Sequence, residues 1–152
     1  GYSHFSGQNA YIGQIGRNDF DGVAGTGTTT VDTDIVALLN TTTTGVLQRG
    51  WEVFFLTNIG TGASLQVNVE EARTEMKSAG FLVDCDAEPS TGTYDGMLTV
   101  VPVEDHEVSG SGTIFDTTAD AGDTDWYQGD STHPNAAGSV QLAKLMKDAV
   151  TA

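Results

Sequence analysis

The apolar run at residues 51–57, WEVFFLT, is the feature that most constrains the fold of this chain. Its centre lacks the alternation of apolar and polar residues that marks a strand with one wet face. It is therefore typical of a strand that is covered on both faces, and such strands occur in parallel sheets with helices on either side. The run predicts the interior of a parallel α/β sheet.

Other apolar patterns alternate with this run along the chain. Residues 10–16 (AYIGQIG) and 81–84 (FLVD) predict two more strands. Apolar residues at helical spacing predict helices between the strands, at positions 31, 35, 38, 39 and 46 with a stop at Gly50, and at 65, 69, 72 and 76 up to Gly80. A last helix is expected from about Asn135. This alternation predicts an α/β fold of three layers, αβα, with a parallel sheet.

Residues 86–128 break the rhythm because they carry no long helical pattern. Within them, the runs 97–103 and 112–115 are expected to pair as a β excursion. We find no internal repeat and no linker that divides the chain. Residues 1–152 are therefore interpreted as one domain with an irregular or β insertion at about 86–128.

The charge balance excludes several classes of partner. The chain has 21 acidic and 6 basic residues and a net charge of -15. Such a surface repels phosphate backbones, so nucleic acid is not an expected partner. No apolar run approaches the ~20 residues of a membrane span. The acidic, Lys-poor and Thr-rich composition favours an extracellular or virion-associated protein, and the single Cys85 permits no internal disulfide.

Two residues before the last predicted helix form a candidate catalytic pair. Asp130 and His133 lie three positions apart, so a turn places both side chains on one side. The carboxylate can then orient the imidazole and stabilise its protonated form, as serine hydrolases require. Pro134 is expected at the first helical position. The alternative is that Asp130 and His133 only cap the helix.

Asn18 is the second candidate because it follows the first predicted strand. Ligands of open α/β sheets bind at the carboxyl ends of the strands, and an Asn there can donate to an oxyanion. Its alternative is a plain turn residue. Trp126 is a candidate for the wall of a substrate pocket, with the anchoring of the long loop as its alternative.

No metal or cofactor is expected. Four acidic residues precede the candidate pair and offer calcium ligands, but their spacing fails the EF-hand pattern, which favours a solvated acidic loop. They are Asp116, Asp120, Asp123 and Asp125.

Two blocks together resemble the SGNH/GDSL hydrolase family. Gly16-Arg17-Asn18-Asp19 matches its Gly-x-Asn-Asp block, and residues 130–135, DSTHPN, match its Asp-x-x-His block with the Pro-Asn extension. The resemblance covers nearly the whole chain. It implies a flavodoxin-like SGNH fold in which Asn18 is an oxyanion donor, His133 the general base and Asp130 its orienting partner, with Gly16 among the substrate-binding residues. The implied reaction is acyl transfer to serine and hydrolysis of an ester, such as an acyl ester or an acetylated carbohydrate.

The chain departs from the family at its nucleophile. The Gly-Asp-Ser block and the oxyanion-hole Gly block have no counterpart before Gly16, so the N-terminal βα units are expected to be missing. Gly129-Asp130-Ser131 is interpreted as a coincidence, because Ser131 shares a loop with His133. Ser3 and Ser6 are the remaining candidates. We therefore expect His133 to serve a serine outside this chain, or none.

Two functional hypotheses remain. The chain is either the C-terminal part of an SGNH-type serine esterase, or a catalytically inactive SGNH-derived subunit that forms a filament or another assembly. In both, a second chain is expected to cover the open edge of the first strand, because unpaired edges invite pairing. That chain is a second copy in one case and a nucleophile-bearing fragment in the other.

Overall fold

The computed structural model describes residues 10–15, 19–20, 22–40, 45–78, 81 and 98–152. They contain a three-stranded sheet in the order β1-β2-β3, formed by β1 (Ala10–Gly13), β2 (Glu52–Leu56) and β3 (Leu98–Val101). Both pairings are parallel, with Ala10 opposite Glu52 and Val53 opposite Leu98. The predicted α/β class with a parallel sheet is therefore confirmed, and the 51–57 run supplies the central strand.

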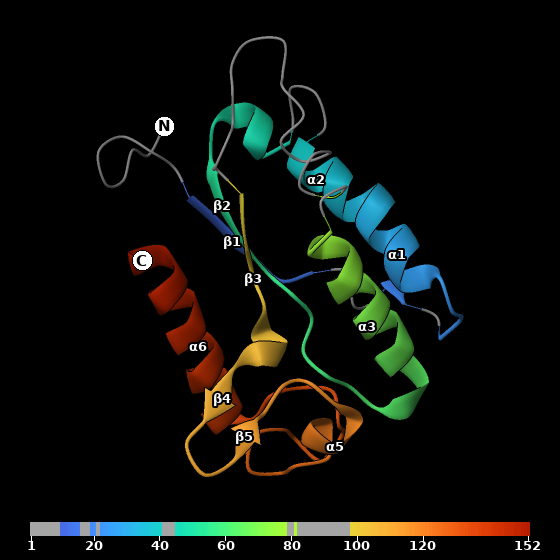
Figure 1. Cartoon of the computed structure of the whole chain (residues 1–152), viewed down its shortest axis with the longest axis vertical. Helices are drawn as coiled ribbons and strands as arrows, with labels where there is room; N and C mark the ends of the chain where they lie inside the picture. The colour runs from blue at the N-terminus through green and yellow to red at the C-terminus, as the bar shows by residue number, and fades with distance from the viewer. Residues whose placement is uncertain (1–9, 16–18, 21, 41–44, 79–80, 82–97) are drawn as a thin grey trace.

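Helices cover both faces of this sheet (Figure 1). On one face lie α3 (Ala63–Met76) and a continuous helical segment made of α1 (Thr26–Thr30), a π-helical turn (Val31–Ile35) and α2 (Val36–Asn40). On the other face lies α6 (Ala136–Thr151). Helices lie at all three predicted places, but the first begins at Thr26 rather than near Val31 and its α2 part ends at Asn40. Val46, which was expected in the same helix, lies in a turn before a separate 3-10 helix. Gly50 ends a short 3-10 helix (Leu47–Arg49) with a left-handed backbone, φ 71°.

Two apolar cores explain why β2 lacks alternation. Val53 and Phe55 point into a core shared with the first helices, while Leu56 belongs to a second core on the α6 side. Because both faces of β2 are covered, apolar residues are required at successive positions. Helix residues of the first core are Val31, Ile35, Leu39, Val69, Ala72 and Met76, and those packed on the second are Leu142, Leu145, Met146 and Ala149.

The third strand differs from the prediction. Phe81 is helical and buried in the first core, and residues 82–84 of the predicted strand lie outside the described residues. The strand beside β2 is Leu98–Val101, from the run that was expected to pair with 112–115. A short apolar run does not distinguish a buried strand from a buried helical segment, which is why the sequence did not predict the helical conformation of Phe81.

The predicted β excursion is also wrong in its pairing. β5 (Gly112–Thr113) pairs antiparallel with β4 (Glu107–Val108). Together with a 3-10 turn (Val103–Asp105) and α5 (Thr118–Ala121), this hairpin lies at the end of the sheet where β2 and β3 end (Figure 1). The buried apolar residues of the whole segment 103–127 belong to the second core: Val103, Ile114, Phe115, Ala121 and Tyr127.

A buried arginine joins these layers. Arg73 on α3 is 4% exposed and uses its whole guanidinium group. Its Nε donates to the carbonyl of Asn58 at 2.8 Å, and its Nη2 to the carbonyl of Phe115 at 2.7 Å. Its Nη1 donates to the carbonyl of Asp116 at 2.8 Å and to that residue's carboxylate at 3.0 Å. Arg73 thus fastens the segment after β2 to the segment after β5.

Glu104 supplies the buried counter-charge. Its carboxylate lies 3.7 Å from Arg73 Nε, accepts a hydrogen bond from Lys77 at 2.6 Å and accepts another from the Thr57 hydroxyl. Burial by itself raises the pKa of Glu104, but the hydrogen bonds from Lys77 and Thr57 and the charge of Arg73 outweigh burial and leave the pKa below its ordinary value. The carboxylate is therefore ionised at neutral pH.

We expect Arg73→Met to lower the free energy of unfolding by about 3–5 kcal/mol, because the change leaves buried carbonyls and part of a buried charge unpartnered. Arg73→Lys should recover only part of the loss, since one ammonium cannot reproduce the planar fork. Urea unfolding followed by circular dichroism measures both. The matched control is Arg49→Met at an exposed arginine, which should change stability by less than about 0.5 kcal/mol. A similarly small effect at Arg73 would contradict this account.

Candidate functional site

The loop that carries Asp130 and His133 is closed by backbone hydrogen bonds. Tyr127 and Pro134 form an antiparallel bridge across it. The amide of Gln128 donates to the carbonyl of His133 at 2.8 Å. These bonds join the two ends of the loop, so residues 128–133 project from a fixed base.

Asn135, and not the candidate pair, caps α6. Its side-chain oxygen accepts from the backbone amide of Gly138 at 3.0 Å, while its own backbone amide donates to the carbonyl of Trp126 at 2.9 Å. Pro134 therefore precedes the cap, which corrects its expected place at the first helical position. Since Asn135 makes the capping bond, Asp130 and His133 are available for another role.

Asp130 and His133 form a direct pair. His133 Nδ1 lies 2.6 Å from Asp130 Oδ2. The other carboxylate oxygen, Oδ1, accepts from the backbone amides of Thr132 at 2.9 Å and His133 at 3.0 Å, which fixes the carboxylate within its own loop. When Nδ1 donates its proton in a hydrogen bond to the Asp130 carboxylate, the lone pair of the neutral imidazole is on Nε2. Among the described residues, none hydrogen-bonds to Nε2.

The pair is exposed, with 67% of the His133 side chain and 46% of the Asp130 side chain accessible. Even so, the pKa of Asp130 is lowered to about 2, first by the hydrogen bond with the His133 side chain and then by the backbone amides of His133 and Thr132. The carboxylate is therefore ionised throughout the physiological range. An ionised carboxylate on Nδ1 is what orients an imidazole and stabilises its protonated form.

Ser131 has an unusual backbone in this loop. Its φ is 53°, and it is the only residue other than glycine with positive φ in the described part of the chain. Its carbonyl accepts from the amide of Gly62 at 3.1 Å. Within the same described part, no hydrogen bond joins the Ser131 hydroxyl to His133. The backbone of Ser131 therefore shapes the turn of the loop and anchors it to Gly62.

The segment after β2 positions the loop at the carboxyl end of the sheet. The Tyr127 hydroxyl donates to the carbonyl of Gly60 at 3.0 Å, and the amide of Gly60 donates to the carbonyl of Phe115 at 2.6 Å. A side chain at position 60 would meet backbone oxygens of Asp116 and Thr117 within 2.9 Å, so only glycine fits. Together with the Gly62–Ser131 bond, these contacts tie the candidate pair to β2.

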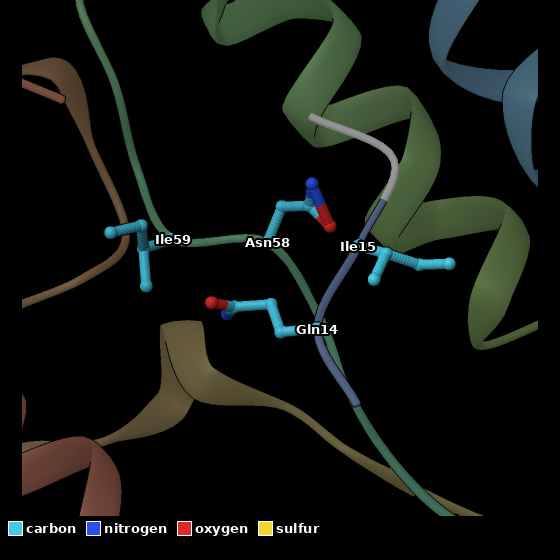
Figure 2. Close-up of a pocket in the computed structure, with 4 residues that line it drawn as sticks. All are labelled: Gln14, Ile15, Asn58 and Ile59. Carbon is cyan, nitrogen blue, oxygen red and sulfur yellow. The ribbon is translucent and has the colours of Figure 1, made fainter. Parts of the chain in front are cut away.

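A small cavity of about 60 Å³ lies where β1 and β2 end. Its walls are Gln14 and Ile15, which follow β1, and Asn58 and Ile59, which follow β2 (Figure 2). Gln14 fastens the two segments because its Nε2 donates to the carbonyl of Thr57 at 2.6 Å. Asn18 and Gly16, the predicted oxyanion donor and its neighbour, lie outside the described residues.

Asn58 is the residue of this cavity that sequence reasoning missed. It is 1% exposed, and neither its amide nitrogen nor its amide oxygen has a hydrogen-bond partner among the described residues. An unpartnered buried amide costs about 1–3 kcal/mol. The available signal was its place just after the central strand, since the carboxyl ends of parallel strands are where ligands bind.

The remaining predicted residues take structural positions. Trp126 packs against the second core and its carbonyl accepts from Asn135, in keeping with the anchoring alternative. Asp116 pairs with Arg73, and Asp120 completes a capping box with Thr117 at α5. Asp123 accepts from the amide of Asp125. Ser3, Ser6 and Cys85 lie outside the described residues.

Within the described ranges, no group of three or more His, Cys, Asp or Glu side chains is placed to hold a metal ion. The described helices include none with the length and hydropathy needed to cross a bilayer.

Comparisons with known proteins add no relative: no family model, curated protein or solved structure matches this chain.

We expect His133→Ala to raise the pKa of Asp130 from about 2 part of the way to its ordinary value of 3.8, because the largest cause of the shift is removed while the amide bonds remain. Because the pKa of Asp130 is lower in the folded state than in the unfolded state, the ionised carboxylate adds to the free energy of unfolding above pH 3.8. This contribution is lost as the pH falls towards 2. Carboxyl carbon NMR titration measures the pKa. An unchanged pKa in the variant would show that the imidazole bond does not form in solution.

Proposed function

We propose that this chain contributes the acid–base half of an SGNH-type serine ester hydrolase. The observation that supports the proposal is the hydrogen bond of 2.6 Å between His133 Nδ1 and Asp130 in an exposed loop, where no described residue hydrogen-bonds to Nε2. An imidazole held in this way can take the proton of a serine hydroxyl as it attacks an ester carbonyl, and can return it to the leaving alcohol. The resemblance of residues 16–19 and 130–135 to the two family blocks supports the same reaction.

The proposed nucleophile is a serine outside residues 1–152. Ser131 follows Asp130 directly and turns through a left-handed backbone, while His133 uses Nδ1 for the carboxylate. A serine on a neighbouring strand end can approach Nε2 across the site instead. In the proposed mechanism, His133 is the general base and acid, Asp130 orients it, and Asn18 donates to the oxyanion.

The test is labelling with a fluorophosphonate probe, followed by peptide mapping. In the native protein that contains this chain, we expect one labelled serine outside residues 1–152, and His133→Ala should abolish labelling. The isolated 152-residue chain should remain unlabelled. It should hydrolyse p-nitrophenyl acetate at least about 10⁴-fold more slowly than the native protein, because triad members act as a unit.

His106→Gln is the matched control for this test. His106 also lies in the second half of the chain, but its Nε2 contacts Gln141 and its ring stacks on Phe115. This variant should keep full labelling. Absence of any labelled serine in the native protein would refute the hydrolase proposal. A label on Ser131, Ser3 or Ser6 in the isolated chain would place the nucleophile within it.

A second candidate function is assembly, and the exposed edge of the sheet favours it. Among the described strands, β1 has β2 as its only neighbour. Ile12 and Ile15 at this edge are 41% and 39% exposed. Ile12 also borders a hollow of about 220 Å³ with Leu142 and Met146 of α6. Such an edge with apolar side chains is suited to pairing with a strand of a second chain.

We expect the isolated chain to self-associate at its β1 edge, and more tightly as salt is added. The net charge of -15 opposes association, and salt screens that repulsion while the apolar contact remains. Sedimentation velocity at several salt concentrations measures the effect. Ile12→Lys should weaken association, whereas Val23→Lys, at an exposed valine on another segment, should not. A salt-independent monomer would contradict this candidate.

A further inference from the structure

The cavity at Asn58 has the properties of a ligand site rather than a packing defect. A buried side-chain amide without partners is rare in folded proteins and calls for an explanation. Asn68 on α3 provides the comparison: it is equally buried and its Oδ1 is also unpartnered among the described residues, but its Nδ2 donates to the carbonyl of Val23 at 2.6 Å. At Asn58, by contrast, both atoms are unpartnered within the described part of the chain.

The chemistry of the walls limits the ligand. Two amides and two isoleucines line the cavity, and none of these side chains is charged. The nearby guanidinium of Arg73 is already engaged, with its Nε on the Asn58 carbonyl and its Nη atoms on the carbonyls of Phe115 and Asp116. An ion would therefore lose its hydration without gaining a counter-charge. A neutral group is favoured.

The free atoms of Asn58 define what this group must offer. Nδ2 requires an acceptor and Oδ1 requires a donor, and the two atoms are adjacent. A hydroxyl or a primary amide supplies both functions, whereas a carboxylate supplies acceptors only. The volume of about 60 Å³ is several times the ~10–15 Å³ that one water needs, so a group of a few heavy atoms fits.

Access runs through the outer wall at the end of β1. Gln14 is exposed and Ile15 is 39% exposed, so the wall that these two residues form borders solvent. The inner wall is fixed, because Arg73 holds the Asn58 carbonyl and Gly60 is packed against Asp116 and Thr117. Figure 2 shows the two pairs of wall residues on their separate segments, Gln14 and Ile15 on one and Asn58 and Ile59 on the other.

We propose that Asn58 is a ligand-binding residue and that the cavity binds a neutral hydroxyl or primary amide group through both atoms of its side chain. If the bound group is part of an ester substrate, the inference rests on the proposed function. The cavity would then hold the uncharged part of that substrate that carries the hydroxyl or amide. As a binding site it is independent of His133.

The test is NMR titration of the 152-residue chain, labelled with ¹⁵N, with glycerol and with acetamide in separate arms. At least one probe should shift the Asn58 side-chain resonances in a saturable way, and the arm that saturates distinguishes a hydroxyl ligand from an amide ligand. The Asn68 amide serves as the internal control and should not move. Acetate, which cannot donate to Oδ1, should produce no saturable shift.

Two variants complete the experiment. Asn58→Leu should weaken binding of the effective probe at least tenfold and abolish the rise in melting temperature that the probe causes. It should nevertheless melt no lower than the unliganded parent, because the unpartnered amide is gone. Asn58→Asp preserves the shape of the side chain but removes the Nδ2 donor, and it should also weaken binding of the probe at least tenfold.

Failure of both neutral probes, saturable binding of acetate, or unchanged probe affinity in the folded Asn58 variants would overturn the proposal. His133→Ala should retain full probe binding. Absence of a labelled serine in the native protein together with intact probe binding would therefore refute the proposed function alone. Normal labelling of the native protein without probe binding would refute the Asn58 site alone.

Discussion

The position of Arg73 constrains everything at the carboxyl end of the sheet. Three carbonyls from segments distant in sequence, at residues 58, 115 and 116, require donors where no strand or helix provides them. One guanidinium group supplies all of them, because it carries five N–H donors in a planar fork. Glu104 balances its charge, and Lys77 and Thr57 satisfy Glu104 in turn. The walls of the Asn58 cavity and the base of the loop that carries Asp130 and His133 depend on this network.

The candidate site therefore combines a rigid base with an exposed tip. At the base, Tyr127 is buried and its hydroxyl donates to the carbonyl of Gly60, while the amide of Gly62 donates to the carbonyl of Ser131. The tip, with Asp130 and His133, is largely open to solvent, so its order comes from hydrogen bonds within the loop rather than from packing. Such a division leaves the imidazole accessible from solvent while the ends of its loop stay fixed.

Local signals in the sequence were enough to predict β2, α3, α6 and the Asp130–His133 pair, because each depends on periodicity or on spacing within one turn. The third strand was not predictable in this way, because short apolar runs stand at both 81–84 and 98–101 and the sequence does not reveal that 98–101 pairs with β2. Arg73 and Asn58 were missed for a related reason. Arg73 matters because it hydrogen-bonds to residues at least 15 positions away in the chain. Asn58 matters because its buried side-chain amide has no partner among the described residues. Neither property shows in the local sequence.

The place of α6 in the chain has a consequence for synthesis. The strands that it covers end at Val101, and the helix begins only at Ala136. Because the N-terminal part of a chain leaves the ribosome first, the sheet can form while Leu56 and Val101 still lack their covering helix. During that interval the nascent sheet presents one apolar face together with the edge of β1 that has no neighbour among the described strands. We therefore expect chaperone engagement to be concentrated in the period before α6 emerges.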